Sequence, residues 1–185
     1  LNAGVTPALI SYVCSKLINV YPVVVPLGIG VKPYFNHLVV EERDLGPSNC
    51  LTTGKSMTKE RVLNLYKRGL EIGKSSQQPV LISESVPGGT TTAQAVMEAF
   101  GLRVSNLVGS SLFKAPRELR RKVVQRGLLN ANFKTDFDSF DVIASVGDPF
   151  QAFSMGLLIG ARFANKPVIL SGGSQMLAVI LLVLE

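Results

Sequence analysis

The sequence of 185 residues has no tryptophan, one histidine and two cysteines. With a single histidine and no Cys-x-x-Cys pair it cannot assemble a zinc site of ordinary His/Cys composition, so we expect no metal. We expect no cofactor either. Cys14 and Cys50 are interpreted as reduced structural thiols of a cytoplasmic protein. His37 is more typical of a loop or surface residue than of a ligand.

Long apolar runs and concentrated charge are also missing. The longest apolar run, Met176 to Leu184, is about half of the roughly 20 residues that a membrane-spanning helix needs, and no secretory signal is evident. We therefore expect a buried helix or strand there, and no membrane partner. The net charge is +6, but no tract of lysine or arginine repeats along the chain. This disfavours a nucleic-acid partner and fits a small anionic substrate better.

The chain is long enough for one substantial core and too short for two full domains. Hydrophobic residues make up 46% of it, which is typical of an ordered globular interior. We therefore expect residues 1–185 to form a single α/β nucleotide-binding domain. The first residue is not methionine and the last residues stop within an apolar run. We expect the chain to be a fragment, or the ordered part of a longer one.

Hydrophobic periodicity predicts that strands and helices alternate along the chain. This order predicts an α/β fold of the Rossmann-like, three-layer αβα kind, with a mostly parallel sheet covered on both faces. Between residues 33 and 56 the pattern predicts a long functional or mobile loop. Strands are expected near residues 23–25, 37–40, 80–82, 104–108, 141–146 and 167–170. Three helices are expected over residues 58–73, with a stop at Gly73, over 93–100 and over 149–164. Three more are expected to begin at Thr6-Pro7, at Pro116 and after residue 174.

The run from Ser83 to Ala93, SESVPGGTTTA, joins an apolar strand to a helical pattern. The backbone N–H groups of Gly88 and Gly89 can approach an anion closely, and the threonine hydroxyls stand at a helix start, which favours negative charge. This pattern predicts a phosphate cradle with Glu84 on its rim. A plain strand-to-helix turn with Thr90 as N-cap is the open alternative. The run is neither a Walker A loop nor a dinucleotide fingerprint, which disfavours a Rossmann-type dehydrogenase.

Glycine and polar residues recur where four of the predicted strands end. Because the carboxyl ends of parallel strands lie along one edge of a sheet, these turns predict a nucleotide-sized cleft there. Asp148-Pro149 is also an ordinary helix start, so two interpretations of Asp148 stay open, ligand contact and helix capping. The four turns contain Gly28 and Gly30, Gly88 and Gly89, Gly147 and Asp148, and Gly172, Gly173 and Ser174.

The segment ESVPGGTTTA resembles the signature of the nicotinate-nucleotide–dimethylbenzimidazole phosphoribosyltransferases, especially their archaeal and cyanobacterial relatives. Further stretches that are similar to this family run in the expected order over nearly the whole chain, at residues 3–8, 27–33, 146–149 and 170–176.

The resemblance implies a glycosyltransferase that moves ribose 5-phosphate from nicotinate mononucleotide to an azole base, in synthesis of the cobamide lower ligand. It also implies a homodimer. Glu84 matches the acid before the family's glycine loop and is the expected catalytic carboxylate. Lys122 matches a lysine that the family directs at phosphate, although a solvated cationic helix face explains it equally well. The expected phosphate-binding residues are Gly88, Gly89, Thr90, Thr91, Lys122, Asp148, Gly172, Gly173 and Ser174.

The sequence departs from the family pattern in one respect. The glutamate that serves as general base in the bacterial enzymes lies beyond the second glycine turn, and this chain ends before it. The base is then on further sequence, is Glu84, or does not exist. A non-catalytic nucleotide- or phosphate-binding protein of the same fold is the alternative function.

Overall fold

The computed structural model describes residues 7–31, 33–42, 45–109 and 116–185, and it has a mixed α/β fold with a parallel sheet. The predicted fold class is confirmed, and the arrangement is consistent with a three-layer αβα fold. In chain order the elements are α1 (Pro7–Leu17), η2 (Leu51–Thr53), α2 (Lys59–Lys74), β1 (Val80–Ser83), α3 (Gly89–Ala99), α4 (Arg117–Ala131), α5 (Ser139–Val146), α6 (Pro149–Phe163), β2 (Val168–Ser171) and α7 (Ser174–Leu184).

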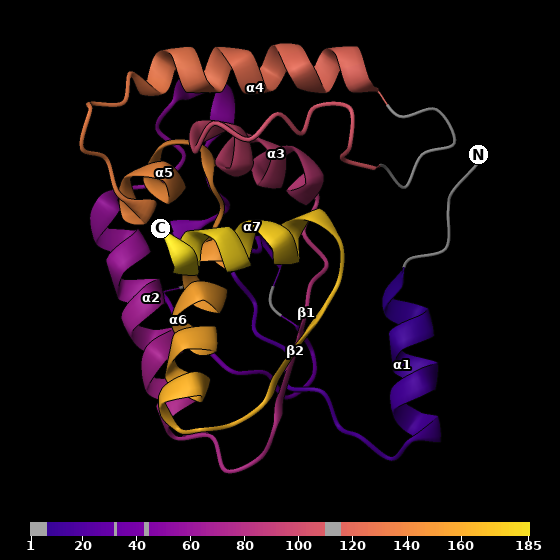
Figure 1. Cartoon of the computed structure of the whole chain (residues 1–185). Helices are drawn as coiled ribbons and strands as arrows, with labels where there is room; N and C mark the ends of the chain where they lie inside the picture. Colours follow the sequence, from indigo (N-terminus) through magenta and orange to yellow (C-terminus); the bar gives the residue numbers. More distant parts are fainter. Residues whose placement is uncertain (1–6, 32, 43–44, 110–115) are drawn as a thin grey trace.

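Strands β1 and β2 lie side by side and parallel (Figure 1), paired from Val80 with Val168 to Ser83 with Ser171. Because side chains alternate along a strand, one face of the sheet is apolar and buried. On that face Ile82 packs with Phe150 of α6 and with Met176 and Val179 of α7. The opposite face carries Leu81 and Ile169, which are 61% and 57% exposed in the described structure.

Helices α2 and α6 pack backbone to backbone, and this explains four glycines. A Cβ added at Gly69, Gly73, Gly156 or Gly160 would collide with main-chain atoms of the other helix. Helix α2 continues to Lys74, so the predicted stop at Gly73 is wrong. That glycine serves close helix packing. The predicted cap at Thr58 is confirmed, because its side chain accepts a hydrogen bond from the N–H of Arg61.

The main core lies among α2, α3, α4, α5, α6 and α7, with α4 lying over α3 (Figure 1). Val62, Val96, Val124 and Val142 are fully buried in it. Arg120 of α4 is buried as well, and its guanidinium donates to the carbonyl oxygens of residues 108 and 109, both at 2.7 Å. Burial lowers the pKa of Arg120. The basic helix predicted after Pro116 is therefore partly anchored by one of its own arginines.

Four of the predicted strands are wrong. Residues 141–146 belong to helix α5, which begins with a capping box in which Asp138 and Asp141 bond each other's backbone N–H. Residues 104–108 form a turn, where the N–H groups of Leu107 and Val108 donate to Val104 O. Residues 23–25 and 37–40 form no strand and share one isolated parallel bridge, between Val24 and His37.

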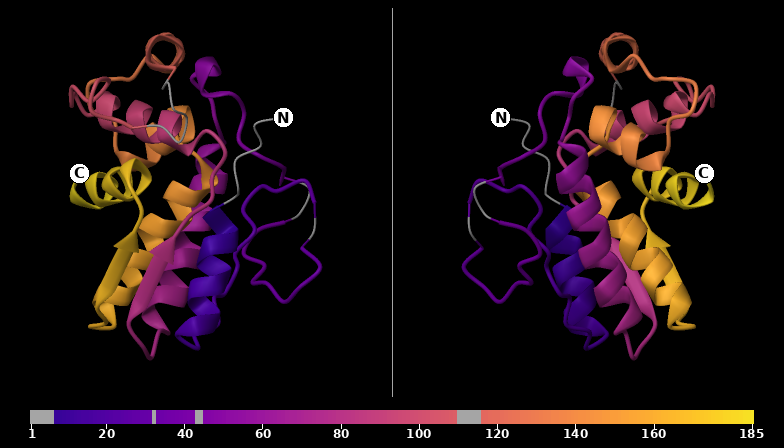
Figure 2. Two further views of the ribbon diagram at one scale, coloured as in Figure 1. Left: turned by 90° about the vertical axis from the view of Figure 1, so that its right-hand side faces the viewer. Right: turned by 90° about the vertical axis from the view of Figure 1, so that its left-hand side faces the viewer.

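Helix α1 stands to one side of the sheet and its helices in Figure 1, and part of the loop after it projects outward in Figure 2, while Val25, Leu27 and Val40 of that loop pack against the main core. A buried ion pair holds this loop to α2. Arg61 donates to both carboxylate oxygens of Glu41 at 2.9 Å, and Glu41 also accepts from the N–H of Gly28. Thr6, the predicted cap of α1, lies outside the described residues, as do residues 3–6 of the family-like segment 3–8. None of the helices in the described ranges is long and apolar enough to cross a membrane.

Candidate functional site

Two glycine-rich loops leave the same edge of the sheet. β1 ends at Ser83 and β2 at Ser171, and these two residues are partners in the register. The first loop leads into α3 at Gly89 and the second into α7 at Ser174, as Figure 1 shows. The structure therefore places the predicted segments Gly88–Thr91 and Gly172–Ser174 after neighbouring strand ends, as the sequence predicts.

The first loop turns at Gly88, which has a φ of 77° and is the N-cap of α3. This left-handed conformation explains the glycine at position 88. The alternative in which Thr90 is the N-cap is wrong, because Thr90 is the second residue of the helix. The N–H of Gly89 already donates to Val86 O. Among the described residues, the N–H groups of Gly88 and Thr90 have no hydrogen-bond partner.

Glu84 lies exposed at the start of this loop. Its Oε2 accepts a hydrogen bond from the N–H of Val86 at 2.7 Å, so the carboxylate braces the loop that it borders. Its other oxygen has no hydrogen-bond partner in the described part of the chain. The carboxylate is thus held at the strand end by one oxygen, while the other stays available.

The second loop offers a longer row of unpaired N–H groups. Gly173 is the N-cap of α7, and its carbonyl accepts from Met176 and Leu177. Within the described residues, nothing accepts from the N–H groups of Gly172, Gly173, Ser174 and Gln175. Unpaired N–H groups at a helix start, together with the helix dipole, favour an anion there.

A buried polar cluster lies directly behind the two loops and joins the starts of α3, α6 and α7. Asp148, the N-cap of α6, is only 3% exposed. Its Oδ2 accepts from the Thr92 hydroxyl at 2.5 Å and from Gln175 Nε2 at 2.7 Å, and its Oδ1 accepts from the N–H of Gln151. The Gln151 amide in turn donates to Gln175 Oε1 at 2.8 Å. The cluster therefore links all three helices.

Burial raises the pKa of Asp148, and the hydrogen bonds from Thr92, Gln175 and the backbone only partly oppose this. Desolvation is the larger effect because the described residues bring no cation to the carboxyl. Direct contact between Asp148 and a ligand stays a prediction, and its capping of α6 is confirmed.

Two glycines of the predicted turns make room for this cluster. A Cβ at Gly89 would lie 2.7 Å from Gln175 Nε2, and a Cβ at Gly147 would lie 2.6 Å from Gln151 Oε1. The turn at Gly147 follows helix α5, and the turn at Gly28 follows no strand. Only two of the four predicted turns therefore leave the ends of strands.

Lys122 lies on α4 with 68% of its side chain exposed, and it pairs with Glu118 one turn away at 3.7 Å. In the described ranges no hydrogen bond joins it to either glycine-rich loop. Its contact with phosphate stays a prediction.

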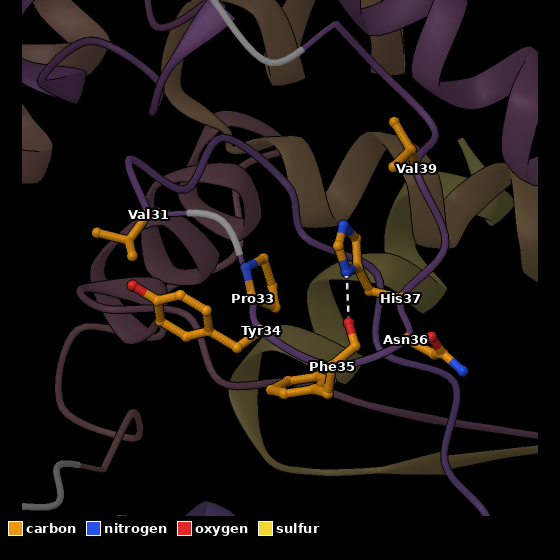
Figure 3. A pocket seen from close by; sticks show the side chains of 7 residues that line it. All are labelled: Val31, Pro33, Tyr34, Phe35, Asn36, His37 and Val39. Atoms are coloured by element: carbon orange, nitrogen blue, oxygen red, sulfur yellow. Dashed lines mark hydrogen bonds between the residues drawn. The ribbon is translucent and has the colours of Figure 1, made fainter.

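A hollow of about 670 Å³ is lined by residues 31, 33–37 and 39 (Figure 3). It is lined by Tyr34, Phe35 and His37 among others, and His37 Nδ1 lies 2.7 Å from Phe35 O. The prediction that His37 is a loop residue is confirmed. The hollow shares no residue with the two glycine-rich loops.

The sequence did not predict the roles of Thr92, Gln151 and Gln175. A local signal exists for Gln151 alone, since Asp148-Pro-Phe-Gln151 has the spacing of a capping box, which the structure contains. Thr92 and Gln175 reach Asp148 across 56 and 27 residues, and no local pattern encodes such contacts.

Comparison with known proteins places the chain among phosphoribosyltransferases. The sequence model of a family described as "Phosphoribosyltransferase" matches residues 9–183. A UPF0284 protein of Prochlorococcus marinus (strain MIT 9312) is 92% identical over all 185 residues, which are 48% of its length. A UPF0284 protein of the archaeon Methanocaldococcus jannaschii is 38% identical over 97% of this chain and 50% of its own. The chain thus spans about half the length of the curated relatives it matches.

The solved structure of CobT from Thermus thermophilus has a similar fold, with a TM-score of 0.74 at 22% identity over 91% of this chain and 52% of that one. A second structure from that organism, described as a nicotinate-nucleotide–dimethylbenzimidazole phosphoribosyltransferase, has a TM-score of 0.69 at 19% identity over 98% of this chain and 58% of that one. On the match to residues 9–183, supported by this fold, the chain belongs to the nicotinate-nucleotide–dimethylbenzimidazole phosphoribosyltransferase family.

Proposed function

We propose that the protein of which this chain forms part moves ribose 5-phosphate from nicotinate mononucleotide to a benzimidazole-type base, in assembly of the cobamide lower ligand. The observation that carries this proposal is the pair of glycine-rich loops at one sheet edge. Together they present unpaired N–H groups from Gly88, Thr90, Gly172, Gly173, Ser174 and Gln175. The family membership and the activity named for the second Thermus structure support these substrates.

In this proposal the two loops hold the 5′-phosphate. Backbone N–H groups and the hydroxyls of Thr90, Thr91 and Ser174 donate to its oxygens, and the positive ends of α3 and α7 favour its charge. Gly89, which has no side chain, lets the Gln175 amide pack directly behind the first loop. Lys122, which pairs with Glu118 in the structure, supplies a further positive charge to the phosphate in this proposal. Asp148 supports the loops through its hydrogen bonds to Thr92 and Gln175.

The chemical step breaks the bond between the ribose anomeric carbon and the nicotinate nitrogen, and nicotinate leaves with the bonding electrons. The anomeric carbon gains positive charge, which the carboxylate of Glu84 stabilises at the rim. The azole nitrogen then forms the new bond to that carbon, and the azole N–H proton passes to a general base. The chain's own candidate for that base is Glu84. We further propose that the protein is cytoplasmic and a homodimer.

The test is turnover by the full-length protein with nicotinate mononucleotide and 5,6-dimethylbenzimidazole. Nicotinate release is expected, and Glu84→Gln should slow it by roughly 100-fold or more if Glu84 serves as acid–base or charge-stabilising group. Glu98→Gln on α3 is the matched control, because Glu98 bonds the Gln94 amide within the helix. Binding of the mononucleotide without any nicotinate release would replace the transferase by a non-catalytic nucleotide-binding protein.

A further inference from the structure

Gln175 is the side chain that connects the two glycine-rich loops. It belongs to the first turn of α7, directly after the second loop, and it is only 2% exposed. Its amide lies against Gly89 of the first loop, where an added Cβ would stand 2.7 Å from Nε2. Through that same nitrogen it bonds Asp148 at the start of α6.

The hydrogen bonds of Gln175 fix its orientation completely. Nε2 donates to Asp148 Oδ2, while Oε1 accepts from Gln151 Nε2. Flipping the amide would set a donor against a donor and an acceptor against an acceptor. A buried amide with both ends satisfied in this way holds its neighbours in one arrangement.

Thr92 completes the connection from the other loop. It lies in the first turn of α3, and its hydroxyl donates to Asp148 Oδ2 at 2.5 Å while also lying 3.0 Å from Gly89 O. Oδ2 of Asp148 therefore accepts one hydrogen bond from a side chain of α3 and one from a side chain of α7. The partners of Asp148 in the described structure are all uncharged, and come from α3, α6 and α7.

We propose that Gln175 and Thr92 are positioning residues, which through Asp148 set the distance between the two loops and so determine how tightly a phosphate is bound. Neither side chain needs to touch the ligand. Their effect comes from fixing the loop that carries the N–H groups of Gly88 and Thr90 relative to the loop that carries those of Gly172 to Gln175. This inference rests on the proposed phosphate site, and goes beyond it by assigning residues that stand behind the site.

The experiment compares two buried glutamines in the full-length protein. Gln175→Met removes the connecting amide with little change in volume. Gln94→Met is the control, since Gln94 is equally buried and lies on α3, but bonds Glu98 and not the loops. Affinity is measured by calorimetry with nicotinate mononucleotide and with inorganic phosphate. We expect Gln175→Met to weaken both by about tenfold, and Gln94→Met to change them by less than about twofold.

A second pair of variants covers the case in which Gln175→Met does not fold. Thr92→Val removes the hydroxyl and keeps the shape, and Thr92→Ser restores the hydroxyl. We expect weaker binding in the first and recovery in the second. In turnover, the KM for the mononucleotide should rise more than kcat falls, whereas mere loss of folded protein lowers kcat alone.

The possible results separate the two proposals. Equal effects of Gln175→Met and Gln94→Met, or wild-type affinity in Thr92→Val, would overturn the positioning role. A wild-type protein that binds the mononucleotide but releases no nicotinate removes the proposed reaction, and the affinities still decide this inference. A wild-type protein that binds neither probe removes both.

Discussion

A Cβ added at Gly89, the first residue of α3, would lie 2.7 Å from Nε2 of the buried Gln175, so a larger residue fits there only if that amide moves. The two residues are 86 positions apart in sequence, and each follows a different strand of the parallel pair. Gly89, which the sequence predicts as a phosphate-binding residue, therefore also makes room for the Gln175 side chain of α7.

This contact predicts the effect of Gly89→Ala. The new methyl group would push the Gln175 amide away from Asp148, and leave buried polar atoms without partners. We expect the free energy of unfolding to fall by about 1–3 kcal/mol, and mononucleotide binding to weaken with it. Urea denaturation and calorimetry measure the two effects. Gly30→Ala is the control, because a Cβ there meets no atom within 4 Å; equal losses in the two variants would contradict the role of the contact.

The raised pKa of Asp148 predicts how stability varies with pH. Because the pKa of a buried carboxyl is higher in the folded state than in the unfolded state, the folded protein binds the proton more tightly. The stabilisation is fully present below the unfolded pKa, which lies near 3.8, and is lost as the pH rises through the folded pKa.

Asp148→Asn isolates this effect, since the variant keeps the other carboxyls and lacks the titration. We expect the free energy of unfolding of the wild type to fall relative to that of the variant as the pH rises from about 4. Urea denaturation at a series of pH values measures the difference. A difference that grows in favour of the wild type with rising pH would show that the pKa of Asp148 is lowered.

The ion pair between Glu41 and Arg61 predicts a large loss of stability when one partner is removed. Both side chains are less than a tenth exposed, so Arg61→Met leaves a buried carboxylate without its cation. We expect the free energy of unfolding to fall by about 3–5 kcal/mol. Arg68→Met removes the exposed pair with Glu71 and should cost no more than about 1 kcal/mol. Similar losses from both variants in urea denaturation would contradict the anchoring role.

The predicted contact of Lys122 with phosphate rests only on the family resemblance, and it can be tested separately. If the lysine serves the phosphate, Lys122→Met should raise the KM for the mononucleotide by about tenfold, as expected for loss of one charge-assisted contact. Arg126→Met, on the same helix, is the control. Equal KM values for the two variants would assign Lys122 to the solvated face of α4, where the structure pairs it with Glu118.

The sequence predicted the elements that carry strong local signals. β1, β2 and helices α2, α3, α6 and α7 lie where periodicity and turn residues place them. Residues 141–146 were predicted as a strand because a short apolar run fits a buried strand and a buried helix equally well. The capping box of Asp138 and Asp141 was the local signal for a helix.

In the candidate site, too, only the parts with a local sequence signal could be predicted. The two glycine-rich loops are predictable because each combines glycines, hydroxyl side chains and a helix start in one segment. The cluster behind them is not predictable, because Thr92, Asp148 and Gln175 meet only when the fold brings three helix starts together. Tertiary contacts of this kind leave no local pattern.

The position of a bound phosphate tests the central claim most directly. In a crystal structure of the full-length protein with nicotinate mononucleotide, the phosphate should lie between the two loops, within hydrogen-bond distance of the N–H groups of Thr90 and Ser174. A mononucleotide whose phosphate lies elsewhere, for example in the hollow beside His37, would contradict the account.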